Sequence, residues 1–171
     1  MAYLWRQDHD NRWHAGTLEE NRCTLVSDAE PSAVPPLAPA LVRTVTSEGA
    51  ERWVVVGDGA SGIRVNGQAF PGIRLLADKD EISVPPRGRF FFSSERLACV
   101  EPFDGSREVS CPRCLRPIKP GDPAVRCPNA NCGALHHQME RWWCWTHEES
   151  CQLCDQLTRF DAGFRWTPEK L

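Results

Sequence analysis

The sequence predicts a mostly β chain with two domains, an N-terminal antiparallel β-sandwich and a small C-terminal domain built around metal ligands. Three observations predict this fold class. Short apolar and β-branched segments recur roughly every 8–12 residues through the first hundred positions, with turn residues between them, which is typical of a sandwich or barrel. Seven of the nine cysteines fall between Cys111 and Cys154, in closely spaced pairs of the kind that bind zinc. The 14 prolines and 12 glycines among 171 residues favour many short elements over long helices.

The first half contains a series of short segments that we expect to be strands. They cover residues 4–5, 13–18, 23–26, 41–46, 52–56, 62–65, 74–76, 81–84 and 89–92. Residues 31–39 are rich in proline and are expected to form a long loop or an edge connection, because proline does not fit a helix interior or a central strand. Residues 53–56 are the most apolar run and predict a central strand buried on both faces. In 90–92, the outer two phenylalanines should lie on one face of a strand and the middle one on the other.

Two turns divide the later segments. Asn66-Gly67 is a good two-residue hairpin turn, because both residues tolerate a positive φ, and residues 78–80 predict another turn.

Residues 57–84 resemble the second half of a forkhead-associated (FHA) domain. The matching positions are Ser61, Val65-Asn66-Gly67, Leu76 and Asp80-Glu81-Ile82. The resemblance implies an FHA-like antiparallel sandwich. The family's Ser-x-Asn-Gly turn lacks its asparagine here, because Gly62 follows Ser61 directly, so a sandwich in which Asn66-Gly67 is only a turn is favoured over a phosphopeptide-binding domain.

Composition sets the domain boundary and excludes some functions. Residues 101–110 have the composition of a linker with a turn at Asp104-Gly105, which predicts domains at 1–104 and 105–171. The formal net charge of −3, with no strongly basic run, makes nucleic acid an unlikely partner. The sequence shows no secretion signal and no apolar run near 18 residues, so we expect a cytoplasmic protein that does not bind a membrane. Clustered cysteines in a reducing cytosol are more often metal ligands than disulfides.

The C-terminal half offers eight metal ligands in four pairs. The pairs are Cys111 with Cys114, Cys127 with Cys132, His136 or His137 with Cys144, and Cys151 with Cys154. Eight ligands complete two tetrahedral zinc sites. Neighbouring pairs could share a metal, which would give two consecutive fingers. Alternatively, the first pair could join the third and the second the fourth, which is a cross-brace. The chemistry of the ligands does not decide between these two arrangements.

The order of short motifs in this region resembles the bacterial RING finger family. The motifs are Cys-x-x-Cys, Ile-x-x-Gly-Asp, Val-x-Cys-Pro, Cys-Gly-x-x-His-His, Cys-Trp and a final cysteine pair. The resemblance implies a cross-braced domain with one short helix, with Cys111, Cys114, His137 and Cys144 at one zinc and Cys127, Cys132, Cys151 and Cys154 at the other. His137 is chosen over His136 because the family's ligand is the second of the two histidines. The spacings 127–132, 137–144 and 144–151 depart from those of the family, which changes the surface but keeps the ligand set.

Both zinc ions are expected to be structural. A segment of about 45 residues buries too little apolar surface to fold alone, and structural zinc is the usual remedy. A catalytic zinc needs an open coordination position, and two complete sets of four ligands leave none. No catalytic residue is therefore predicted, and function should reside in a surface.

The RING resemblance implies which surface that is. In RING-type ubiquitin ligases the zinc loops hold a ubiquitin-conjugating enzyme, and the matching residues here are Pro112, Arg113, Leu115, Trp145, Gln152 and Leu153. Such a domain speeds transfer by orienting the reactants, without a catalytic side chain. The expected function is that of a ubiquitin-ligase-like protein in a bacterial ubiquitin-like conjugation system, with the β-domain recruiting a target or modifier. Asp155 occupies a position where active ligases often carry a cation, so a non-enzymatic protein–protein adaptor with two structural zincs is the alternative.

Overall fold

The chain is mostly β-strand and divides into two compact units. The computed structural model describes residues 2–25, 39–47, 51–57, 62–85, 88–105, 109–129 and 131–170. One unit comprises Met1–Ser94 with Thr167–Leu171, and the other comprises Glu95–Trp166. All paired strands in the described part of the chain are antiparallel. The predicted mostly β, antiparallel fold class is thus confirmed. No helix in the described residues has the length and apolar character needed to cross a membrane.

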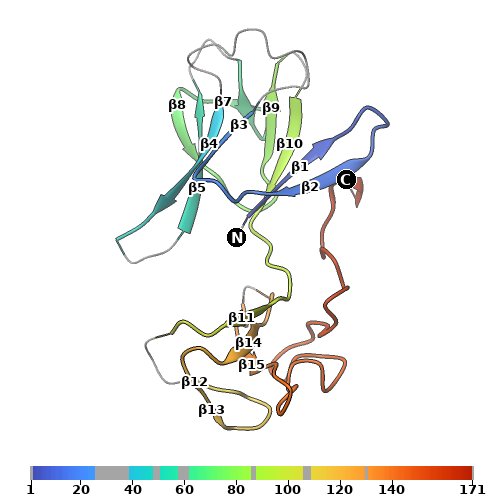
Figure 1. Ribbon diagram of the computed structural model, residues 1–171. Helices are drawn as coiled ribbons and strands as arrows, with labels where there is room; N and C mark the ends of the chain where they lie inside the picture. The colour runs from blue at the N-terminus through green and yellow to red at the C-terminus, as the bar shows by residue number, and fades with distance from the viewer. Residues whose placement is uncertain are drawn as a thin grey trace. The chain divides into compact units, whose positions relative to one another are not determined.

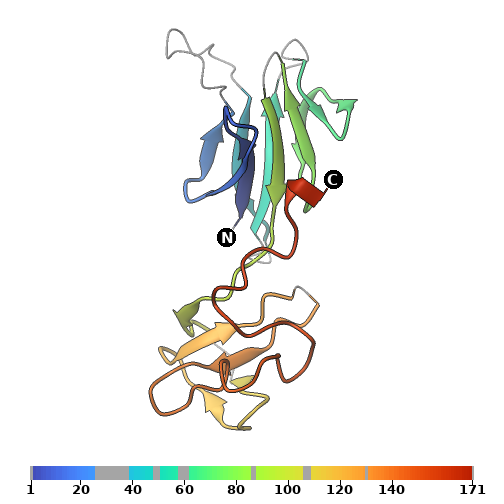
Figure 2. The same ribbon diagram turned by 90° about the vertical axis from the view of Figure 1, so that its right-hand side faces the viewer.

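The first unit consists of two sheets (Figures 1 and 2). The six-stranded sheet contains, in spatial order, β2 (Trp13–Thr17), β1 (Tyr3–Gln7), β10 (Gly88–Ser93), β9 (Glu81–Val84), β6 (Arg64–Val65) and β7 (Gln68–Ala69). The four-stranded sheet contains β3 (Arg22–Thr24), β4 (Ala40–Val45), β5 (Glu51–Gly57) and β8 (Gly72–Leu75). Leu4 and Ile82 of the first sheet and Leu41 and Val55 of the second share one buried core. The two sheets therefore pack face to face as a sandwich.

In strands β10 and β5, successive side chains point to opposite faces of their sheets. Phe90 and Phe92 belong to the sandwich core, whereas the ring of Phe91 points the other way and lies 5.2 Å from the ring of Trp13. This confirms the face assignment predicted for the three phenylalanines. Strand β5 lies between β4 and β8, but only alternate residues are buried, and Val54 and Val56 are half exposed. The expectation of burial on both faces was wrong, because the four-stranded sheet packs against another sheet on one side only.

The Asn66-Gly67 turn joins β6 and β7 as predicted. The two residues have φ of 51° and 75°, the left-handed values that a tight hairpin turn requires. The Asn66 side chain is fully engaged in the structure of the turn: its Oδ1 accepts the backbone N–H of Glu81 at 2.9 Å, and its Nδ2 donates to Asp80 at 2.7 Å. Ser61 of the FHA-like segment and most of the proline-rich stretch lie outside the described residues.

The second unit contains two small sheets. Strands β11 (Val100–Pro102), β14 (Pro123–Arg126) and β15 (Leu135–His137) form one, and β12 (Val109–Ser110) and β13 (Pro117–Ile118) form the other. Because β11 pairs with β14, the boundary falls after Ser94, ten residues before the predicted one. The predicted short helix is absent from the described residues of 95–166. The helical segment that the structure does show is the 3-10 turn η1 (Pro168–Lys170), which clusters with the first unit.

Two small apolar clusters take the place of a single core in the second unit. Ala124 of β14 packs in a cluster that contains Cys111 and Cys144. The next residue, Val125, lies in a cluster that contains Cys127 and Cys151. Successive side chains of a strand point to opposite faces, so β14 contributes to both clusters in turn. Each cluster is therefore built around cysteines.

Candidate metal centres

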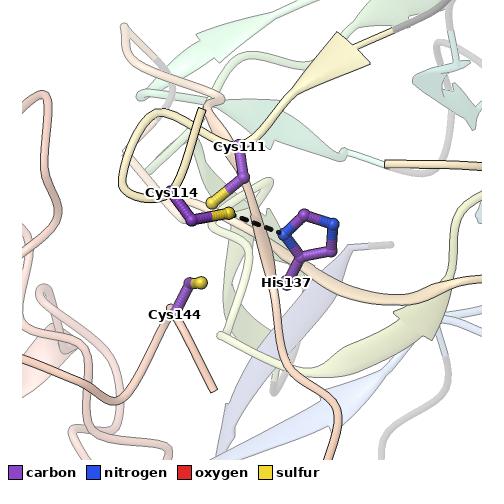
Figure 3. A group of neighbouring side chains, drawn as sticks. All are labelled: Cys111, Cys114, His137 and Cys144. Atoms are coloured by element: carbon purple, nitrogen blue, oxygen red, sulfur yellow. Dashed lines mark hydrogen bonds between the residues drawn. The ribbon is translucent and has the colours of Figure 1, made fainter. Parts of the chain in front are cut away.

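The eight predicted ligands form two separate groups of four. The sulfur and imidazole nitrogen atoms within each group all lie within 4.8 Å of one another. One group contains Cys111, Cys114, His137 and Cys144 (Figure 3), and the other contains Cys127, Cys132, Cys151 and Cys154. The first ligand pair of the chain thus joins the third, and the second joins the fourth. This is the crosswise arrangement.

The antiparallel pairing of β14 and β15 explains the crosswise arrangement. Cys127 follows the last residue of β14, and its backbone N–H donates to Ala134 just before β15. His137 ends β15 and lies opposite Ala124, near the start of β14. Because the strands run in opposite directions, their C-terminal ends lie at opposite ends of the pair. The two strands therefore deliver their ligands to different sites.

The His137 ring is oriented by a hydrogen bond on the side away from the sulfur atoms. Its Nε2 lies 3.2 Å from the carbonyl oxygen of Pro117, and its Nδ1 lies 3.4 Å from the Cys114 sulfur (Figure 3). With Nε2–H donating to the carbonyl, Nδ1 carries the lone pair and faces the three cysteines. The imidazole is fully buried. A ligating histidine is commonly held in this way by a backbone carbonyl, so the residues present fit a bound metal ion.

The electrostatics of the first group also fit a cation. Burial raises the pKa of the Cys111 thiol, but the backbone N–H groups of Cys114, His137 and Arg113 oppose it and bring the pKa down to about 7. Burial, followed by the charge of Cys111, raises the pKa of Cys144 to about 12. A thiolate at Cys111 thus disfavours a second thiolate at Cys144. A metal ion would supply the positive charge that stabilises them together.

The second group consists of sulfur ligands alone. The sulfurs of Cys127 and Cys154 are 3.6 Å apart, and those of Cys132 and Cys151 are 3.9 Å apart. Burial raises the pKa of the Cys127 thiol, and the neighbouring sulfurs raise it further. Four sulfur atoms that converge in this way suit a bound cation, which would stabilise them as thiolates.

His136 lies beside the second group and belongs to neither set of four. It is fully buried, its Nε2 lies 3.9 Å from the Cys151 sulfur, and its ring packs edge-on against Trp145 with centroids 5.3 Å apart. Burial lowers the pKa of His136 to about 4, which is consistent with a neutral packing residue. The structure therefore places the second histidine, His137, among the ligands.

The six residues predicted to bind a partner do not all lie at the surface. Leu115 and Leu153 are 79% and 65% exposed, Gln152 is also exposed, and Pro112 is half buried. Trp145 is fully buried against the second group, so the expectation that it contributes to a binding surface was wrong. The burial of Trp145 could not be predicted from the spacing of the ligands. Three tryptophans lie close together in this part of the sequence, and the spacing does not indicate which of them is buried.

Arg113 has a structural role that sequence reasoning missed. Its side chain is only 10% exposed, and it forms an ion pair with Glu148 at 3.2 Å. It also donates to the carbonyl oxygen of Ser150 at 3.0 Å. Arg113 therefore ties the loop of the first ligand pair to the segment just before Cys151. Arg113 donates to a backbone carbonyl, that of Ser150, and His137 likewise contacts the backbone carbonyl of Pro117. Backbone acceptors of this kind cannot be identified from a sequence motif.

Comparison with known proteins leaves the family open. No family model matches the sequence, and the comparison with curated proteins found no match. Among solved structures, the chain is similar to the Slr1951 protein from Synechocystis sp., with 18% identity and a TM-score of 0.41 over 56% of this chain and 100% of that one.

Proposed function

We propose that each group of four ligands binds one structural Zn²⁺. The donors are three cysteines and a histidine in one group and four cysteines in the other, and these are the donor sets of closed structural zinc sites. Zinc would hold the two loops of each site together and replace the apolar core that the second unit lacks. No catalytic role at the metal is proposed, because all four ligand positions of each site are supplied by the protein.

We further propose that the second unit, Glu95–Trp166, acts as a RING-type ubiquitin-ligase-like module that recruits a ubiquitin-conjugating enzyme. This unit is called the zinc unit from here on. The observation that supports this most is the crosswise arrangement of the two ligand groups, which is the arrangement that the RING resemblance implies. Leu115 follows the first ligand pair and Leu153 lies within the last one, and both present exposed apolar side chains. Exposed apolar residues on zinc loops suit a protein partner.

The β-sandwich is proposed to recruit the target or the modifier. Ile73 and Leu75 of the edge strand β8 are 68% and 58% exposed, and they pair with the half-exposed Val56 and Val54 of β5. These four side chains form an apolar strip on the outer face of the four-stranded sheet. Such strips favour contact with another protein. Recognition of a phosphopeptide through Asn66 is not proposed, because its side chain is engaged by Asp80 and Glu81.

A conjugation assay tests the ligase proposal. Purified protein would be added to its cognate modifier, activating enzyme and conjugating enzyme, and transfer would be timed. We expect faster transfer, and loss of that stimulation in Leu115→Ala and Leu153→Ala. The matched control is Val100→Ala, which removes a 47% exposed apolar residue of the same unit that lies in strand β11 and not in a ligand loop. No stimulation by the unaltered protein would refute ligase activity.

The alternative is an adaptor that binds proteins without promoting transfer. The burial of Trp145 favours it, because one of the predicted contacts is removed from the surface. The exposed Asp155, directly after the last ligand, favours it too, since active ligases often have a cation there. Binding of the conjugating enzyme with no change in transfer rate would support the adaptor over the ligase.

A further inference from the structure

Two exposed arginines of the zinc unit lie against one tryptophan. The guanidinium carbon of Arg116 is 5.1 Å from the centroid of the Trp142 ring, and that of Arg141 is 5.3 Å from it. Both distances are typical of cation–π contacts. Arg116 follows the first ligand pair, and Arg141 precedes the ligand Cys144 by three residues, so two separate segments bring their cations to the same ring.

Neither arginine has an acidic partner within the described part of the chain. No carboxylate there lies within 4.0 Å of either guanidinium, including that of Glu140, the neighbour of Arg141. A guanidinium stacked on an aromatic ring keeps its N–H groups available, and these donors match the geometry of a carboxylate. Two like charges near one ring repel each other, and a negative group that approached both would reduce this repulsion.

Leu115, the residue directly before Arg116, presents an exposed apolar side chain. Among the described residues it is the most exposed large apolar side chain, at 79%, and its φ is 60°. The left-handed conformation disfavours leucine and favours glycine. A large apolar side chain is thus displayed to solvent at a position where local geometry would select a smaller residue. Unfavourable backbone of this kind often occurs at functional sites.

We infer that Arg116, Arg141 and Trp142, together with Leu115, form a docking surface for an acidic protein segment that also carries an apolar side chain. The carboxylates would pair with the two guanidinium groups, and the apolar side chain would cover Leu115. Trp142 packs against the ligand His137, with ring centroids 5.4 Å apart, so the surface is anchored on the first metal site. The inference requires a folded zinc unit but no modifier transfer, and a negative conjugation assay would not affect it.

The test is a titration of the isotopically labelled full chain, loaded with zinc and followed by NMR. The probe is a short synthetic peptide of glutamates flanking one leucine, and the comparison peptide has glutamine in place of every glutamate. We expect the acidic peptide to shift the Trp142 indole and Leu115 signals in a saturable way, with weaker binding as salt is added. Arg116→Gln and Arg141→Gln should each weaken binding about two- to fivefold, which is the size of an exposed charge contact.

Matched variants and a small anion define the outcomes that would overturn the inference. Lys119→Gln/Arg159→Gln removes two other exposed cations of the unit and should leave binding unchanged, whereas Arg116→Gln/Arg141→Gln should weaken it by the product of the two single losses, about 4- to 25-fold. Equal losses in both double variants would mean nonspecific attraction and would refute the surface. Equal shifts with inorganic phosphate would assign a small-anion site instead, and no saturable shift at Trp142 would exclude the docking surface. An unchanged spectrum elsewhere confirms that each variant is folded.

Discussion

At the scale of single residues, Leu115 combines an unfavourable backbone conformation with high exposure. We predict that Leu115→Gly raises the free energy of unfolding of the zinc unit by about 0.5 kcal/mol, because relief of the left-handed φ, about 1–2 kcal/mol, exceeds the roughly 0.5–1 kcal/mol that glycine's added freedom in the unfolded chain costs. Little packing is lost with the side chain, which is 79% exposed. Chemical denaturation of the zinc-loaded protein measures the change.

The matched control for Leu115→Gly is Leu153→Gly. Leu153 is also an exposed leucine of a ligand loop, at 65%, but it is not among the residues with positive φ. Glycine there should lower the free energy of unfolding by about 0.5–1 kcal/mol, because it adds freedom to the unfolded chain without relieving any strain. Equal destabilisation by the two changes would contradict the role assigned to the φ of Leu115.

His137 and His136 are adjacent and equally buried, yet we predict opposite effects on metal content. His137→Ala should lower bound zinc from about two to about one ion per chain, because it removes one of four ligands. His137→Cys should restore it, since cysteine supplies an equivalent donor. His136→Ala should retain both ions and reduce stability through lost packing against Trp145. Elemental analysis of purified variants distinguishes these results, and loss of an ion in His136→Ala would contradict the assignment.

At the scale of elements, Arg113 connects two loops that are distant in the sequence. We predict that Arg113→Met destabilises the zinc unit by about 1–3 kcal/mol, because the carbonyl of Ser150 loses a charged donor in a mostly buried setting. Glu148→Gln should change stability by about 0.5 kcal/mol or less, because Glu148 is 63% exposed and exposed ion pairs contribute little. Denaturation curves of the two variants provide the measurement. Similar effects would mean that the ion pair, rather than the Ser150 hydrogen bond, links the loops.

Features of single strands and turns could be predicted from the sequence, whereas contacts between distant segments could not. Strand alternation placed Phe90, Phe91 and Phe92 correctly because a period of two is a local property. The Asn66-Gly67 turn was predictable for the same reason, since its φ values depend on two residues. The burial of Trp145 and the start of the second unit at Glu95 depend on pairings between distant segments, β11 with β14 among them. Nothing in the local sequence specifies those contacts.

At the scale of the whole molecule, the two units differ in what holds them together. The sandwich has one core shared by two sheets, whereas the second unit has two small clusters that each contain ligand cysteines. A fold of the first kind is stabilised by apolar burial. A fold of the second kind would depend on a bound metal, because binding energy at a structural zinc site is folding energy.

We therefore predict that removing zinc unfolds residues 95–166 and leaves the sandwich folded. A strong chelator added to the full chain should collapse the NMR dispersion of Trp142, Trp143 and Trp145, while Trp5 and Trp53, which lie in the first unit, keep their native signals. Returning zinc should restore the lost signals, and magnesium should not, because thiolates select softer ions. Unfolding of both units together would show that the sandwich depends on the metal unit. Retention of all signals after complete metal removal, checked by elemental analysis, would refute the structural role of zinc in this protein.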